Sequence, residues 1–298
     1  MKKVKNTIPV YDICALERSN SSTNSQIIAE PFAEYLKAHP NLHLAHRHSF
    51  YHIVLFTKGG GFHTIDFERF DVTAGQIYFM IPGQVHSWNF EGETDGFVIN
   101  FSEHLFEHFL VSNEYLEAFS FFQGIAADGV VQLQPKALAE AQEIIQNIVR
   151  DMEQPDAYTN DYVRASLIAL FISVSRQASR TIAPTAKPHN QLLLVNFRKL
   201  VDKYYSDKRL PKDYAALLYI TPNHLNALCQ DMIGKSAGEV IRDRILLEAK
   251  RLLINADMNI SQIAAKLEFT DNSHFSKFFK KYTNSTPEEF RRKATTNI

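Results

Sequence analysis

The sequence predicts an α+β protein built from an N-terminal β-barrel with flanking helices and a C-terminal all-α domain. Short apolar runs punctuated by glycine occupy residues 44–101, which is typical of an antiparallel barrel. Residues 189–298 contain only two glycines and space their apolar residues by threes and fours, as helices do. A chain of 298 residues is also long enough for about two domains, each with its own core.

The two parts differ in charge. A stretch with two prolines and small polar residues, 179–189, is expected to be a linker between domains at 1–178 and 190–298. The chain carries a formal charge of −1, but residues 1–188 hold 14 basic and 21 acidic side chains and residues 189–298 hold 18 and 12. The N-terminal part is therefore acidic, at −7, and the C-terminal part basic, at +6. A basic domain favours a nucleic-acid partner.

The sequence predicts a cytoplasmic protein with no membrane association. No run approaches the roughly 18 apolar residues of a membrane span, and the basic N-terminus is not followed by the apolar core of a signal peptide. Cys14 and Cys229 lie far apart and have no partners at metal-site spacing, which fits a reducing compartment.

In the N-terminal part, the expected strands are followed by two amphipathic helices. The strands are predicted at 51–57, 62–67, 75–81 and 96–101, and the helices at 135–152 and 157–178. The apolar stripes of both helices are expected to pack on the barrel.

In the C-terminal part, two helix-turn-helix motifs are expected on either side of one longer helix. They lie at 212–230 and 260–281. Thr221 and Pro222 mark a helix start in the first unit, and a capping box of Ser236 and Glu239 begins the connecting helix. That helix, of about 19 residues, would span roughly 28 Å. Because successive major-groove faces of DNA lie roughly 34 Å apart, the two second helices are expected to enter adjacent grooves.

The second unit and its surroundings carry many residues at fixed spacing. They are Ile260-Ser261-Gln262-Ile263-Ala264, Phe269-x-Asp271-x-x-His274-Phe275-Ser276-Lys277-x-Phe279-Lys280-Lys281 and Thr286-Pro287-Glu288-Glu289-Phe290-Arg291. This run resembles the signature of the arabinose-regulator (AraC/XylS) family of bacterial transcription factors, and the resemblance covers about the last 110 residues. It implies a transcription regulator that binds double-stranded DNA and a small-molecule effector. It also implies a homodimer, formed through the helices that follow the barrel, and RNA polymerase as a further partner.

The resemblance assigns base-reading positions residue by residue. They are Asn223, Asn226 and Ala227 in the first unit, and Asn272, Ser273 and Lys277 in the second. Lys280 and Lys281 are expected either to contact phosphates or to form a merely solvated basic face. Ala227 and Cys229 replace the usual Arg and Phe, so the first unit is expected to make fewer DNA contacts. Glu268 replaces a glycine of the second turn, which predicts a turn of slightly different geometry.

Two local motifs resemble the cupin fold, the usual sensor domain of this family. They are His46-Arg47-His48 with His52, and the segment that runs from Gly75 through His86 to Trp88. We expect His46, His48, His52, His86 and Trp88 to line the effector pocket of this cupin-like barrel. On one continuous strand, His46, His48 and His52 would share a face.

Metal binding is the alternative at these four histidines. In metal-binding cupins the ligands come from His-x-His, a following Glu and a later His, and imidazole suits Zn, Fe, Ni or Cu. Because regulators of this family mostly bind an organic ligand in the barrel, no cofactor or metal is predicted.

The leading interpretation is a ligand-responsive, sequence-specific transcription regulator that is not an enzyme. No Ser/His/Asp arrangement, phosphate-binding loop or dinucleotide fingerprint suggests catalysis. Two alternatives remain open: a metal-dependent cupin enzyme fused to a DNA-binding domain, and a DNA-binding repressor without a ligand.

Overall fold

The chain divides into two compact units, with the boundary between Pro184 and Thr185. The computed structural model describes residues 8–16, 26–107, 109–110, 114–181, 188–254 and 258–296. Of the predicted linker, residues 182–187 lie outside the described residues, helix α5 continues to Thr181 and helix α6 begins at Pro188. Within the described ranges, no helix is long and apolar enough to cross a membrane.

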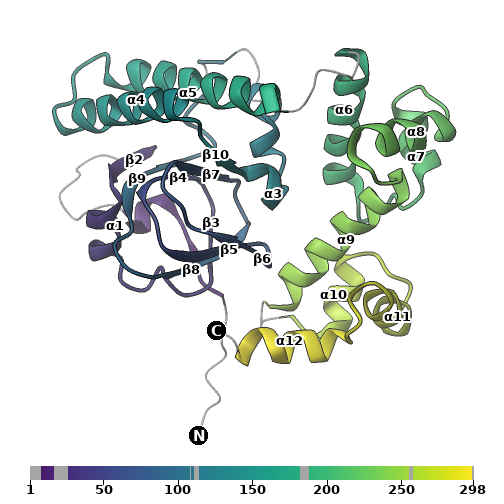
Figure 1. Ribbon diagram of the computed structural model, residues 1–298. Helices are drawn as coiled ribbons and strands as arrows, with labels where there is room; N and C mark the ends of the chain where they lie inside the picture. Colours follow the sequence, from purple (N-terminus) through teal and green to yellow (C-terminus); the bar gives the residue numbers. More distant parts are fainter. Residues whose placement is uncertain are drawn as a thin grey trace, which may run out of the picture. The chain divides into compact units, whose positions relative to one another are not determined.

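The N-terminal unit contains two five-stranded sheets that face each other (Figure 1). In spatial order, the first sheet consists of β1 (Val10–Tyr11), β3 (His46–His48), β8 (Val85–Phe90), β5 (Gly61–Ile65) and β6 (Glu68–Asp71). The second consists of β10 (Val130–Gln132), β7 (Gln76–Met80), β4 (Tyr51–Lys58), β9 (Asp95–Phe101) and β2 (Ile27–Pro31). Neighbouring strands are antiparallel except β1 and β3, which run parallel. The cupin-like β-barrel with flanking helices is confirmed.

Strand β4 has an almost unbroken apolar run because both of its faces are buried. Val54 and Phe56 belong to the core inside the barrel, whereas Ile53 and Leu55 belong to a second core shared with α4 (Pro135–Glu153) and α5 (Thr159–Thr181). These two helices lie side by side across the outer face of the second sheet (Figure 1). The predicted packing of both helices on the barrel is confirmed.

The structure differs from the sequence-based expectations for the strands in two details. The chain turns at Asp66 and Phe67, which have φ values of 47° and 75°, so β5 ends before the predicted residue 67. His46, His48 and His52 do not share one strand, because β3 ends at His48 and β4 begins at Tyr51 in the opposite sheet. Alternation continues through this corner because both strands turn the same set of side chains toward one interior.

Short helices complete the N-terminal unit around the two sheets. They are the 3-10 helices η1 (Ile13–Leu16) and η2 (Ser120–Phe122) and the α-helices α1 (Phe32–Ala38), α2 (Glu114–Glu117) and α3 (Ala126–Gly129). Phe32 and Tyr35 of α1 are fully buried in the core inside the barrel.

The C-terminal unit is helical in all its described elements and contains both predicted helix-turn-helix units. Its helices are α6 (Pro188–Tyr204), α7 (Pro211–Leu217), α8 (Pro222–Ile233), α9 (Ala237–Leu253), α10 (Ile260–Lys266), α11 (Asn272–Thr283) and α12 (Pro287–Thr296). The hydroxyl of Thr221 accepts from the His224 N–H at 3.1 Å and caps α8 as predicted. Phe269, Phe275 and Phe279 are buried in the core that the described helices of this unit share.

A left-handed residue follows the first helix of each unit. Tyr219 has a φ of 55° and Glu268 a φ of 53°, so Glu268 adopts a conformation that favours glycine. A side chain in this conformation costs roughly 1–2 kcal/mol. The turn nevertheless forms, and α11 follows it with Asp271 as its N-cap.

Candidate functional site

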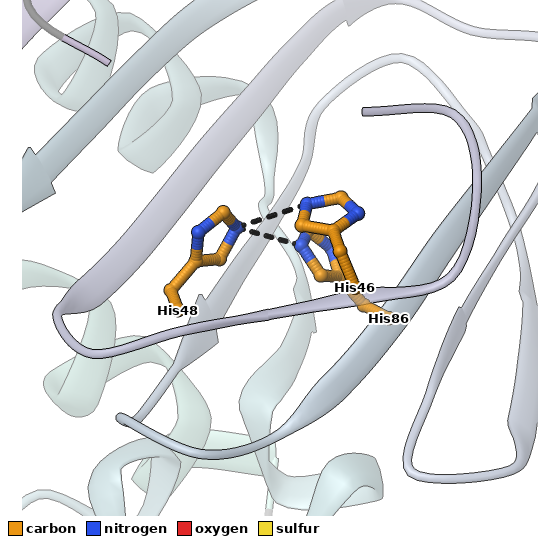
Figure 2. Close-up of side chains that lie close together, drawn as sticks. All are labelled: His46, His48 and His86. Atoms are coloured by element: carbon orange, nitrogen blue, oxygen red, sulfur yellow. Dashed lines mark hydrogen bonds between the residues drawn. The ribbon is translucent and has the colours of Figure 1, made fainter. Parts of the chain in front are cut away.

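Three histidine side chains meet inside the barrel (Figure 2). His46 of β3 pairs across the sheet with His86 of β8, and His48 lies two residues beyond His46 on the same inner face. The Nε2 atom of His48 lies 3.2 Å from Nε2 of His46 and 2.8 Å from Nε2 of His86. All three side chains are at most 2% exposed. The sheet pairing thus brings residues 38 positions apart into direct contact.

Burial keeps these imidazoles neutral. Loss of hydration lowers the pKa of His46 to about 4 and moves the pKa values of His48 and His86 well below the ordinary value of 6.5. The like charges that neighbouring protonated rings would carry lower the pKa values of His48 and His86 further. At neutral pH the cluster therefore offers lone pairs and N–H groups, and no positive charge.

His52 lies beside this cluster but belongs to a separate hydrogen-bond network. The amide oxygen of Asn100 only accepts, so His52 Nδ1 donates to it at 2.6 Å, and His52 Nε2 accepts from the Tyr78 hydroxyl at 3.0 Å. Trp88 Nε1 donates to the Tyr78 oxygen at 3.0 Å, and Asn100 Nδ2 donates to the Tyr35 oxygen at 3.3 Å. Both nitrogens of His52 are engaged in this network, Nδ1 as a donor and Nε2 as an acceptor, which fixes His52 as a neutral ring.

The five predicted effector residues thus lie together, but in two different roles. His46, His48 and His86 converge on one point, whereas His52 and Trp88 support the network around Tyr78. The prediction did not include Asn100 or Tyr35. Asn100 leaves a signal in the sequence, because it is a buried polar residue within the apolar run 97–101 of β9.

Aromatic rings occupy the space around the three histidines. The ring of Tyr11 lies 5.4 Å from that of His46, the ring of Phe50 lies 4.4 Å from that of His48, and the indole of Trp88 lies 5.1 Å from the His86 ring. Phe50 and Trp88 are at most 4% exposed. A ligand of sugar size at this point therefore requires side chains to move.

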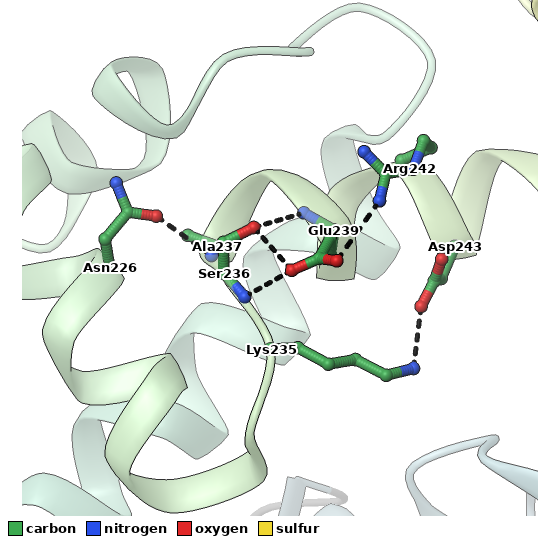
Figure 3. Close-up of polar contacts among 7 residues, drawn as sticks. All are labelled: Asn226, Lys235, Ser236, Ala237, Glu239, Arg242 and Asp243. Carbon is green, nitrogen blue, oxygen red and sulfur yellow. Dashed lines mark hydrogen bonds and ion pairs between the residues drawn. The ribbon is translucent and has the colours of Figure 1, made fainter.

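In the first helix-turn-helix unit, Asn223 and Ala227 are exposed on α8, but Asn226 is half-buried. The side-chain oxygen of Asn226 accepts from the Ala237 N–H at 3.0 Å, at the first residue of α9 (Figure 3). The predicted capping box lies beside it: Ser236 Oγ accepts from the Glu239 N–H at 3.2 Å, and Glu239 accepts from the Ser236 N–H at 2.7 Å. Asn226 therefore joins α8 to α9 within the domain.

In the second unit, the predicted DNA-binding residues lie on the exposed side of α11. Exposed side chains are Asn272, Ser273, Lys277, Lys280 and Lys281. Ser273, Lys277 and Lys281 recur every four residues and so share one face, opposite the buried Phe275 and Phe279. The Asn272 side-chain nitrogen donates to Ser261 Oγ of α10, which orients the amide at the start of the helix.

Two family models match the chain, one over each unit. The model described as "AraC-like ligand binding domain" matches residues 34–172, and the model described as "Helix-turn-helix domain" matches residues 214–293. The chain belongs to the AraC family of transcription regulators. Its ligand-binding domain contains the histidine cluster, and its DNA-binding domain contains α8 and α11.

Curated relatives are AraC-family regulators. The transcriptional activator RhaR of Yersinia pestis is 22% identical over 251 residues, which cover 83% of this chain and 84% of that protein. RhaR of Cronobacter sakazakii is 21% identical over 254 residues, 84% of this chain and 87% of that protein. The chain is accordingly a transcription regulator and not an enzyme, and the alternative of a cupin enzyme is wrong.

Solved structures with a similar chain include ToxT of Vibrio cholerae. One ToxT structure aligns with 90% of this chain and 98% of its own, at 13% identity and a TM-score of 0.43. Another, bound to an unsaturated fatty acid, aligns with 91% of this chain and 96% of its own, at 14% identity and a TM-score of 0.42.

Proposed function

We propose that this AraC-family regulator recognises its operator mainly through α11, with a smaller contribution from α8. The main support is the exposed face of α11, which combines hydrogen-bonding side chains with Lys277, Lys280 and Lys281 in a domain of charge +6. On α8, Asn226 is engaged within the domain and Ala227 offers only a methyl group. Asn223 is then the remaining polar base-reading position of the first unit.

The effector is proposed to act from the barrel interior around His46, His48 and His86. Binding there shifts the population between arrangements that differ in DNA affinity, as ligand-linked equilibria require. The active form is proposed to be a cytoplasmic homodimer that contacts RNA polymerase. Activation is proposed as its direction, because the RhaR relatives are named activators.

The test of the DNA-binding proposal begins with selection of duplexes from a random pool by the full-length protein. Affinity for a selected duplex is then measured by fluorescence anisotropy at several salt concentrations. Lys277→Ala is expected to weaken binding and to reduce the salt slope by about one, because one phosphate or base-edge contact is lost. Asn272→Ala is expected to change base preference at one position. Lys136→Ala removes an exposed lysine from the other domain and serves as the control.

Unchanged binding and unchanged base preference in both α11 variants would refute α11 as the base-reading helix. The effector proposal is tested with the same duplex, by addition of metabolites to the full-length chain. A screen in which no metabolite stabilises the protein against heat or changes its duplex affinity would favour the DNA-binding repressor without a ligand. Sedimentation of the free and duplex-bound protein tests the homodimer.

A further inference from the structure

The histidine cluster has no hydrogen-bond arrangement of its own that accounts for its geometry. A neutral imidazole carries one N–H, and His46 uses it at Nδ1, which donates to the Leu44 carbonyl at 2.7 Å. Nε2 of His46 is therefore unprotonated and carries a lone pair. Nε2 of His48 lies within hydrogen-bond distance of two other Nε2 atoms and has at most one proton to share. No assignment of protons makes both short contacts ordinary, two-centre hydrogen bonds.

The Nδ1 atoms of His48 and His86, which point away from the centre of the cluster, differ from the nitrogens of His52. Among the described residues, Nδ1 of His48 and Nδ1 of His86 have no hydrogen-bond partner, although both atoms are buried. Both nitrogens of His52 are engaged. No hydrogen bond of Nδ1 therefore accounts for the orientation of His48 and His86 toward His46, whereas a cation at the centre would accept all three lone pairs.

The distances fit a metal ion. A tetrahedral site with metal–nitrogen bonds of about 2.0–2.1 Å separates its ligand nitrogens by about 3.3–3.4 Å. The ligand nitrogens of His46, His48 and His86 all lie within 4.8 Å of one another, and Nε2 of His48 lies 3.2 Å from that of His46 and 2.8 Å from that of His86. Small ring movements therefore admit an ion. The Leu44 carbonyl also gives His46 the outer partner that a ligating imidazole usually has.

We propose that His46, His48 and His86 bind one divalent transition-metal ion in the barrel of this regulator, with Zn²⁺ as the first candidate. Three neutral imidazoles select ions such as Zn²⁺, Ni²⁺ or Co²⁺ over Mg²⁺ and Ca²⁺, which prefer oxygen. His52 is not a ligand, because its nitrogens serve the Tyr78 network. The fourth position is open to water or to an anionic group of an effector. The site is thus a three-histidine site, and it adds an ion that the proposed function does not require.

The experiment uses the tag-free full-length protein after treatment with a chelator. Titration with Co²⁺ is followed by the visible absorption of tetrahedral cobalt, and bound Zn²⁺ is counted by elemental analysis after gel filtration. One ion per chain is expected, together with a rise in the melting temperature on addition of Zn²⁺. His46→Gln and His86→Gln are each expected to weaken binding by about 100-fold or more, because each removes one of three ligands.

His52→Gln is the matched control, because it replaces an equally buried histidine of the same barrel and should retain one ion per chain. Circular dichroism shows whether each variant is folded. If a variant does not fold, the titration of the wild-type protein alone decides whether the chain binds one ion. Absence of stoichiometric binding by the wild type overturns the proposal, as does binding that survives in folded His46→Gln and His86→Gln. A chain that binds its duplex but no metal would overturn this inference alone and leave the proposed function intact.

Discussion

Asn226→Ala is expected to destabilise the DNA-binding domain and to leave base preference unchanged. Its side-chain oxygen accepts from the N–H of Ala237, a fully buried residue at the first position of α9. Removal of this acceptor leaves a helix N-terminal N–H without its partner, which costs about 1–2 kcal/mol. For a domain of this size, the melting temperature then falls by about 5–15 °C.

The chain offers two spectroscopic probes for this measurement. Trp88 is the only tryptophan in the sequence and lies in the barrel, so its fluorescence reports unfolding of the ligand-binding domain alone. Far-UV circular dichroism also reports the helices of the DNA-binding domain. We expect Asn226→Ala to shift the helical transition and to leave the Trp88 transition in place.

The matched control is Asn223→Ala, three positions earlier on the same helix and exposed. Its stability should change by less than about 0.5 kcal/mol, because no buried group loses a partner. The reasoning is refuted if the two variants have equal stability, or if Asn226→Ala keeps its stability and changes base preference at one operator position.

Two further predictions concern stability. Burial lowers the pKa of His52 to about 3 and of His46 and His63 to about 4 in the folded protein. In the unfolded chain these histidines keep the ordinary pKa of 6.5, so below pH 6.5 the unfolded chain binds more protons than the folded protein. The free energy of unfolding should therefore fall as the pH drops below 6.5, by about 1.4 kcal/mol for each of these histidines at pH 5.5. Denaturant titrations followed by Trp88 fluorescence should give a lower midpoint at pH 5.5 than at pH 8. Equal midpoints would contradict the expectation. Glu268→Gly should stabilise the DNA-binding domain by about 0.5 kcal/mol, since relief of the left-handed strain exceeds the added chain entropy. A lower helical melting temperature in this variant would show that Glu268 makes a compensating contact.

The DNA-binding domain could be predicted closely from the sequence because its signals are local. The Thr221 cap, the Ser236–Glu239 capping box and the spacing around Phe275 and Phe279 each specify structure within a few residues. The sequence could not show in this way that Asn223 is exposed while Asn226 bonds within the domain. Both are polar and lie in one turn of helix, and only the position of α9 buries one of them.

In the barrel, the sequence pattern could not predict how the strands pair. Alternation placed His46, His48 and His52 on an inward face correctly, but it could not show that the chain changes sheets between His48 and Tyr51. The same period of two continues through the corner because both sheets face one interior. The contact of His48 with His86 depends on the pairing of β3 with β8, which no local pattern specifies.

Strand β4 gives the barrel a physical route from its interior to its helices. His52, Val54 and Phe56 lie on its inner side, next to the histidine cluster and the aromatic core. Ile53 and Leu55 alternate with them and pack in the core that contains α4 and α5. Because close-packed cores transmit displacements, a ligand that moves side chains on the inner side of β4 also changes the packing of these helices. A metal ion held by β3 and β8 lies in the other sheet, so it would act on β4 through His52, whose ring stacks on His48 at 4.9 Å.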